Sequence, residues 1–206
     1  PPPAPGAETL WIGPDPAELP ADRRAQAEPH LVRSYRSAPL LFATFQEGRF
    51  EDLAAVNCGY AVSTNGGRNW HRALVPHMIE SLDGGPYLRA SDPVAAIDRQ
   101  DHLWLCLLGV RAIQPRLVTD VVLCRSTDGG QSFAPPTVVF AAPNAENFPD
   151  KNWFTINTFP DTPTTDRILV SYTYFTLATA QVHVTYSDDG GVTWSTPRPV
   201  GPTLAQ

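Results

Sequence analysis

Acidic residues precede three apolar runs of the sequence at nearly regular intervals. Glu28, Asp92 and Asp150 each stand before a run of aliphatic or aromatic residues. Lys151, the only lysine of the chain, follows Asp150 directly, and Arg89 lies three residues before Asp92. Carboxylates accept hydrogen bonds, and a guanidinium group can bind a carboxylate through two parallel hydrogen bonds. These five residues are therefore candidates for ligand binding, and Arg89 is the candidate for binding an anion.

The same side chains also have structural interpretations. A carboxylate at Asp92 or Asp150 could cap turn amides and hold neighbouring sheets in register. Arg89 could be a surface arginine paired with Asp83 or Asp92. Trp153 and Phe154 alternate along one apolar run, so one ring faces each side of a strand. We expect both rings to serve packing rather than sugar stacking.

A second motif, Ser-x-Asp/Asn-Gly-Gly-x-x-aromatic, follows each acidic residue after 35, 34 and 37 residues. Its three copies begin 63 and then 61 residues apart. The defining residues are Ser63, Asn65, Gly67, Trp70; Ser126, Asp128, Gly130, Phe133; and Ser187, Asp189, Gly191, Trp194. Such regular spacing indicates three copies of one structural unit.

The chemistry of this motif predicts a tight hairpin turn. The Asp or Asn side chain can accept backbone N–H groups of its own loop, and the glycines allow positive φ. The serine can hydrogen-bond across the turn, while the aromatic ring forms a hydrophobic plug. One or two carboxylates per loop are too few for a calcium site of about six to eight oxygens. We therefore interpret the motif as structural.

Each unit is predicted to contain four β-strands, because short apolar runs alternate with Gly, Asp and Pro clusters. The expected strands lie near residues 31–35, 39–46, 54–63 and 69–75; 93–97, 102–108, 118–125 and 132–140; and 153–157, 167–175, 181–187 and 193–200. Residues 1–27 form a proline-rich lead-in, within which residues 16–27 are expected to be a short helix or coil.

The repeated motif resembles the Asp-box, or BNR, repeat of the sialidase superfamily of β-propellers. The resemblance covers about residues 28 to 200. It implies an all-β fold of three four-stranded antiparallel blades, at about 28–80, 87–142 and 146–200, as part of a six- or seven-bladed ring. In that family the box closes the outer hairpin of a blade, away from the active site. The runs that begin at Asp92 and Asp150 resemble inner-strand starts of secreted bacterial members, which implies a secreted or cell-surface location.

The resemblance places a ligand site at the mouth of a central channel, where the innermost strands begin. The candidates there are Glu28, His30, Arg89, Asp92, Glu146, Asp150 and Lys151, and the long loops after the second strands add Arg49, Glu51, Asp52, Arg111 and Arg116. Sialidases use an arginine triad, a Tyr–Glu nucleophile pair and an Asp acid/base. The family's Arg-Ile-Pro motif is absent here, and no catalytic residue is assigned. A sialidase-type glycoside hydrolase and a non-catalytic propeller that binds glycan or protein both remain open.

The expected ligand is a glycan or another small acidic molecule. Three blades are fewer than the four to eight of typical propellers. We therefore expect further blades, or a second copy of the chain, to complete the ring.

Composition excludes several other classes of protein. The chain of 206 residues is 42% hydrophobic and 17% charged, with a formal charge of −6. This argues against a disordered chain and against a nucleic-acid binder, and no apolar run reaches the length of a membrane span. The five histidines show no zinc-ligand spacing, and no phosphate-binding loop is present, so no metal or cofactor is expected. Cys58, Cys106 and Cys124 are expected to be buried thiols, although a Cys106–Cys124 disulfide is conceivable.

Overall fold

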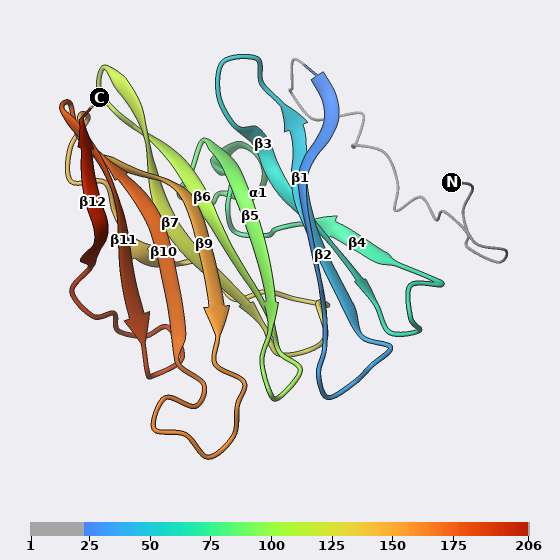
Figure 1. Ribbon diagram of the computed structural model, residues 1–206. Helices are drawn as coiled ribbons and strands as arrows, with labels where there is room; N and C mark the ends of the chain where they lie inside the picture. Colours follow the sequence, from blue (N-terminus) through green and yellow to red (C-terminus); the bar gives the residue numbers. More distant parts are fainter. Residues whose placement is uncertain (1–22, 206) are drawn as a thin grey trace, which may run out of the picture.

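The computed structural model describes residues 23–205, which form twelve β-strands and one short helix (Figure 1). The predicted all-β fold is confirmed. The helix α1 (Glu80–Asp83) has four residues and lies between β4 and β5. No helix in the described part of the chain has the length and apolar character needed to cross a membrane.

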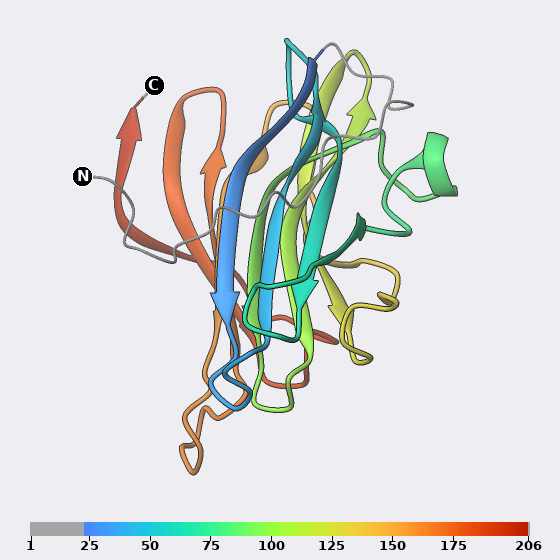
Figure 2. The ribbon, with the colours of Figure 1, turned by 90° about the vertical axis from the view of Figure 1, so that its right-hand side faces the viewer.

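The strands form three antiparallel units of four, which we call blades 1 to 3, and within each unit consecutive strands pair. A single residue pair, Ala55 with Ala90, joins the sheets of blades 1 and 2, whereas blade 3 is a separate sheet. Blade 1 contains β1 (Arg23–Arg33), β2 (Leu41–Arg49), β3 (Ala55–Ser63) and β4 (His71–Leu74). Blade 2 contains β5 (Arg89–Ile97), β6 (Leu103–Ile113), β7 (Arg116–Ser126) and β8 (Thr137–Phe140). Blade 3 contains β9 (Phe148–Ile156), β10 (Ile168–Phe175), β11 (Thr179–Ser187) and β12 (Arg198–Ala205). The blades stand side by side in sequence order, and Figure 2 shows them edge-on.

The innermost strands β1, β5 and β9 begin several residues before the predicted runs. β1 already pairs with β2 at Arg23 and Arg49, so residues 23–27 are extended. The expectation of a helix or coil is wrong for these residues, because pairing with β2 overrides their moderate helix propensity. Residues 16–22 lie outside the described part of the chain, as does the Pro-rich start of the lead-in.

Two apolar cores hold the blades together. Between blades 1 and 2, Phe42 and Tyr60 pack with Phe133, whose ring centroid lies 4.8 Å from that of Tyr60. Between blades 2 and 3, Phe154 and Tyr172 join a second buried cluster. Each blade thus buries one sheet face on its neighbour, as stacked repeats must, because one such unit cannot bury both its faces alone.

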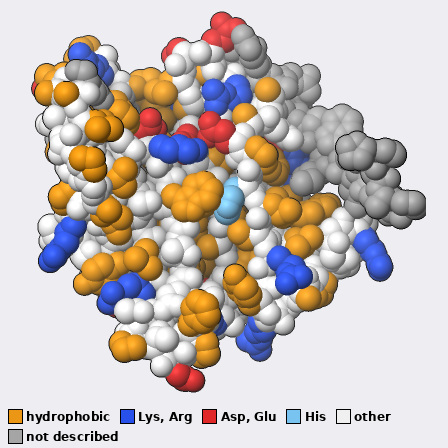
Figure 3. Space-filling model, viewed as in Figure 1, with side chains coloured by type: hydrophobic (Ala, Val, Ile, Leu, Met, Phe, Trp, Pro, Cys, Tyr) orange, Lys and Arg blue, Asp and Glu red, His pale blue; other side chains and the backbone are white. Residues whose placement is uncertain are grey.

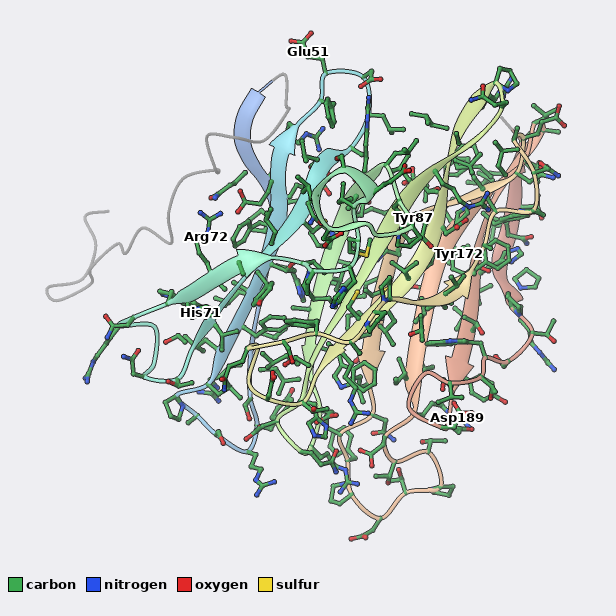
Figure 4. All side chains as sticks on the ribbon, turned by 180° about the vertical axis from the view of Figure 1, so that it is seen from behind. Glu51, His71, Arg72, Tyr87, Tyr172 and Asp189 are labelled. Atoms are coloured by element: carbon green, nitrogen blue, oxygen red, sulfur yellow. The ribbon has the colours of Figure 1, made fainter. Side chains whose placement is uncertain are left out.

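The three Asp boxes form the turns between the third and fourth strands. In every box the serine Oγ accepts the N–H of the second glycine at 2.8 Å and donates to the Asn or Asp side chain at 2.7–3.0 Å. Figure 4 shows Asp189 of the third box and Glu51 of the β2–β3 loop at opposite ends of the molecule. The boxes therefore lie far from the loops that follow the second strands.

The second glycine of a box also contacts the preceding blade. A Cβ atom added to Gly130 would lie 2.7 Å from Val62 Cγ2 of blade 1, and one added to Gly191 would lie 3.2 Å from Leu123 Cδ2 of blade 2. Tyr60 of blade 1 reinforces the first contact by donating its hydroxyl to the Gly130 carbonyl at 2.9 Å. Each box is thus both a turn and a spacer between blades.

Candidate functional site

The three innermost strands share a β-bulge at the same level of the sheet. Glu28, Asp92 and Lys151 occupy its first position and have positive φ values of 51°, 48° and 49°. Such φ values are unfavourable for residues other than glycine, and backbone strain of this kind concentrates at functional sites. Pro29 and Pro93 follow the first two, and proline suits a bulge because it has no N–H to donate to the ladder. The bulges thus make this level of the inner strands the candidate site.

The pairing register corrects one sequence-based equivalence. Asp150 pairs with Thr173 before the bulge of blade 3, at the position of Ala27 and Ser91 in the other two blades. Lys151, not Asp150, therefore corresponds to Glu28 and Asp92. The equivalence of the three acidic residues was wrong because blade 3 has one residue more between the acidic residue and the first paired residue after the bulge.

The bulge residues and their neighbours form a mixed-charge cluster that we call the carboxyl cluster: Glu28, Arg49, Asp92, Asp150 and Lys151. Lys151 Nζ lies 3.8 Å from Asp92 Oδ2, and Arg49 Nη1 lies 4.0 Å from Glu28 Oε1. The Asp92 side chain is only 13% exposed, whereas that of Lys151 is 64% exposed. Four of the five ligand-binding candidates are thus brought together. Figure 3 shows acidic and basic side chains gathered on this face of the molecule.

The carboxyl groups of Glu28 and Asp150 have raised pKa values. Burial raises the pKa of Glu28, and the negative charge of Asp92 and a hydrogen bond between the two carboxyls raise it further. Burial likewise raises the pKa of Asp150. The pKa of Glu28 rises because burial and a nearby negative charge both disfavour the ionised form of a carboxyl group.

A groove of about 580 Å³ lies beside the cluster, along the inner strands. Trp153 is 49% exposed in it, and its ring packs edge-on against His30 with centroids 5.0 Å apart. Tyr35 and Phe159, which are 89% and 74% exposed, also line it. Trp153 is half-exposed in the groove and packs on His30 of blade 1, whereas Phe154 has the expected packing role and is buried between blades 2 and 3.

His30 connects blades 1 and 2 at the groove. Its Nδ1 accepts the N–H of Ala95 at 3.0 Å, and burial lowers its pKa. The imidazole is therefore neutral near pH 7, with its proton on Nε2. It provides the groove with an uncharged polar edge beside the Trp153 ring.

Arg89 is engaged outside the cluster. Its Nη1 donates to Asp52 Oδ1 at 2.7 Å and to the Leu53 carbonyl at 2.8 Å, and its guanidinium lies 3.9 Å from the Phe50 ring centroid. The partner is Asp52, rather than Asp83 or Asp92. Arg111 is similarly held by Asp120 through two hydrogen bonds of 2.7 and 3.0 Å. Both arginines fasten loops in this structure.

Two residues of the site were missed by sequence reasoning. Gln46 and Ser91 are buried beneath the carboxyl cluster and hydrogen-bond to it. The available signal was a single amide within the apolar run of the second strand. Such a residue belongs to no sequence motif, and only its neighbours in the structure show that it contacts the site.

The described residues contain no group of three or more His, Cys, Asp or Glu side chains that could hold a metal ion. Cys58, Cys106 and Cys124 are free and buried, as expected. Burial raises the pKa of Cys124 to about 12, so this thiol is unreactive at neutral pH.

Comparisons with known proteins agree with this geometry. The family described as BNR/Asp-box repeat matches residues 185–196, which contain the third box. Solved structures extend the likeness to nearly the whole chain. The Hadza microbial sialidase Hz136 superposes with a TM-score of 0.60 at 16% identity, over 85% of this chain and 38% of its own. An α-L-arabinanase of Penicillium chrysogenum gives 0.61 at 17%, over 94% and 52%.

The chain carries Asp-box repeats and has the sialidase-type β-propeller fold. The sialidase of Trypanosoma rangeli gives a TM-score of 0.52 at 13% identity, over 83% of this chain and 30% of its own. The propeller described here thus spans about a third to a half of these relatives. No curated protein sequence matches it.

Proposed function

We propose that the inner-strand face of this propeller binds a glycan. The Trp153 ring in the groove carries the proposal, because an exposed aromatic face beside polar groups offers both apolar contact and hydrogen bonds to a sugar. The carboxyl cluster at one end supplies acceptors and a cationic Lys151. The propeller fold shared with a sialidase and an arabinanase supports a glycan as the ligand class.

The cluster favours binding over hydrolysis by this chain alone. Glycosidases hold two carboxyls about 5–5.5 Å apart when they retain configuration, and about 6.5–9.5 Å apart when they invert it. Glu28 and Asp92 instead lie within hydrogen-bonding reach of each other. A water or a glycosidic oxygen has no room between them in this arrangement.

Hydrolysis is the second candidate, and the raised pKa of Glu28 favours it. Glycoside cleavage requires a general acid, and a raised pKa brings a carboxyl group closer to the range in which it can serve as one. It would need the two carboxyls to separate around a bound sugar. Release of a fluorogenic aglycone from sialosides and arabinosides tests this alternative.

Calorimetric titration with sialyl- and arabino-oligosaccharides tests the proposed binding. We expect Trp153→Ala to weaken binding by about tenfold or more, because stacking on one ring contributes roughly 1–3 kcal/mol. Tyr186→Ala is the matched control, since Tyr186 is a 39% exposed aromatic residue of the same blade that lies outside the groove. Equal affinities of the two variants would disprove the role of Trp153, and no binding by the unmodified chain would disprove the proposal for these glycans.

A further inference from the structure

A buried amide connects two of the three carboxyl groups of the cluster, those of Glu28 and Asp92. Gln46, in β2, is fully buried, and its Nε2 donates to Glu28 Oε2 at 3.0 Å and to Ser91 Oγ at 2.8 Å. Ser91 Oγ in turn donates to Asp92 Oδ1 at 2.7 Å. One side chain of blade 1 thus provides a donor to Glu28 directly and supports the donor to Asp92 across the blade boundary.

The orientation of this amide is fixed by its remaining partner. Arg49 Nη1 donates to Gln46 Oε1, so the carbonyl oxygen faces Arg49 and the NH₂ group faces the carboxyls. Both N–H donors and the acceptor of the amide are therefore used. A flipped amide would set its NH₂ group against the guanidinium.

The fold itself does not require an amide at this position. Gln46 pairs with Ala27 just before the bulge of β1, and the corresponding residue of blade 2, opposite Ser91, is Leu108. Leu108 is 1% exposed and belongs to the apolar core between blades 2 and 3. Burying an amide in place of leucine costs stability unless the amide forms hydrogen bonds, as Gln46 does with Glu28, Ser91 and Arg49.

We infer that Gln46 is a positioning residue that holds the Glu28 and Asp92 carboxyl groups against each other and favours their ionised forms. The inference rests on the proposed function, because it gives the carboxyl pair its ligand-binding state. An amide does not titrate, so at every pH it donates to Glu28 directly and to the Ser91 hydroxyl, which donates to Asp92. Its hydrogen bonds favour the carboxylates, whereas burial and the repulsion between the two negative charges favour protonation.

Three further charged groups face the pair. Arg49 from β2 and Lys151 from β9 favour ionisation, and Asp150 from β9 opposes it through its charge. Of these, only Arg49 contacts Gln46, so Gln46→Leu also removes a hydrogen-bond partner of Arg49. Ser91→Ala leaves that contact in place, so a shift shared by Gln46→Leu and Ser91→Ala reports on the hydrogen bonds between the amide and the carboxyl pair.

Lys151 allows the pair to be observed directly. Reductive methylation with ¹³C-formaldehyde labels this single lysine and the N-terminal amine, and Lys151→Arg assigns the two signals. Because Lys151 Nζ lies 3.8 Å from Asp92, its methyl resonance should show a step as the pair titrates. We expect Gln46→Leu, the residue of blade 2, to move this step upward by about one pH unit, the size expected for the loss of a hydrogen bond to a charged group.

Thr44→Val is the matched control. Thr44 is a fully buried residue of the same strand whose hydroxyl donates to the Gly59 carbonyl at 2.9 Å, away from the carboxyls. It should leave the step in place. If Gln46→Leu does not fold, Ser91→Ala removes the donor to Asp92 and the acceptor of one Gln46 N–H, keeps the donor to Glu28, and should still move the step upward.

An unchanged or lowered step in the folded Gln46→Leu and Ser91→Ala proteins would overturn the inference, as would an equal shift in Thr44→Val. The titration needs no ligand. Its outcome is therefore independent of whether oligosaccharides bind, and the failure of one proposal is distinguishable from the failure of the other.

Discussion

Single residues make equivalent positions of the blades chemically different. The bulge position carries Glu28, Asp92 and Lys151 in blades 1, 2 and 3. Lys151 approaches Asp92 at 3.8 Å, whereas the cation nearest to Glu28, Arg49, lies at 4.0 Å and is also bound to Gln46. The threefold repetition of the backbone thus produces a site in which each bulge side chain has a separate role.

Single residues also determine how the Asp boxes respond to acid. Hydrogen bonds from Ser132 lower the pKa of Asp128 to about 2, and those from Thr193 lower the pKa of Asp189 to about 2. A depressed pKa means that the folded state binds a proton less readily than the unfolded state. The stabilisation is complete above the unfolded pKa of about 3.9 and is lost as the pH falls toward 2.

We therefore predict that replacing both carboxylates, Asp128→Asn with Asp189→Asn, reduces the free energy of unfolding at pH 7. The difference from the unmodified protein should shrink between pH 4 and pH 2, as followed by urea denaturation. Asp161→Asn, at an exposed carboxylate in the β9–β10 loop, is the control. A difference that stays constant over this range would contradict the prediction.

At the scale of elements, the second and third boxes each contact the blade that precedes them. The first glycine of each box has open space around an added Cβ, whereas the second faces the neighbouring blade. In the first box no preceding blade lies beside Gly67 among the described residues, and its nearest contact is Leu41 Cδ1 of its own blade at 3.4 Å. The same substitution at the second glycine should therefore affect stability differently in each of the three blades.

We predict a graded effect of alanine in the boxes. Gly129→Ala should cost about 1–2 kcal/mol, since its φ of +73° is unfavourable for alanine but its surroundings are open. Gly130→Ala should cost a further 1–3 kcal/mol or so, because the new methyl group overlaps Val62. Urea denaturation measures both, and Gly67→Ala should resemble Gly129→Ala. Equal costs for Gly129 and Gly130 would mean that the box does not space the blades.

At the scale of the whole molecule, blade 3 presents a sheet face that no described blade covers. Val182, Val200 and Leu204 are 44%, 53% and 62% exposed on β11 and β12. The corresponding faces of blades 1 and 2 are buried by the next blade. A second copy that placed its first blade on this face would close six blades with twofold symmetry.

We predict that the chain of 22.5 kDa associates through this face. Light scattering should give a mass above that of one chain, and Val200→Glu with Leu204→Lys should return it to one chain. Leu82→Glu, at a 41% exposed leucine of α1, should not. A stable monomer of the unmodified chain would contradict association and favour further blades as the covering partner.

The sequence by itself determined the repeat, the twelve strands and the chemistry of the turns. These follow from local rules: alternation of apolar residues, glycines that allow positive φ, and Asx side chains that bind their own loop. It also identified Glu28, Asp92, Asp150 and Lys151, because charged residues before apolar runs are visible in one dimension.

Only the tertiary structure decided which of these side chains share a site. Each bulge adds one residue to the inner strand and so reverses the alternation of sides beyond it. In blade 3 the acidic residue Asp150 lies one position before the bulge, so Lys151 takes the place that Glu28 and Asp92 have in the other blades. The roles of Trp153, Gln46 and Arg89 were equally beyond reach of the sequence, because each depends on a neighbouring blade or loop distant in the chain.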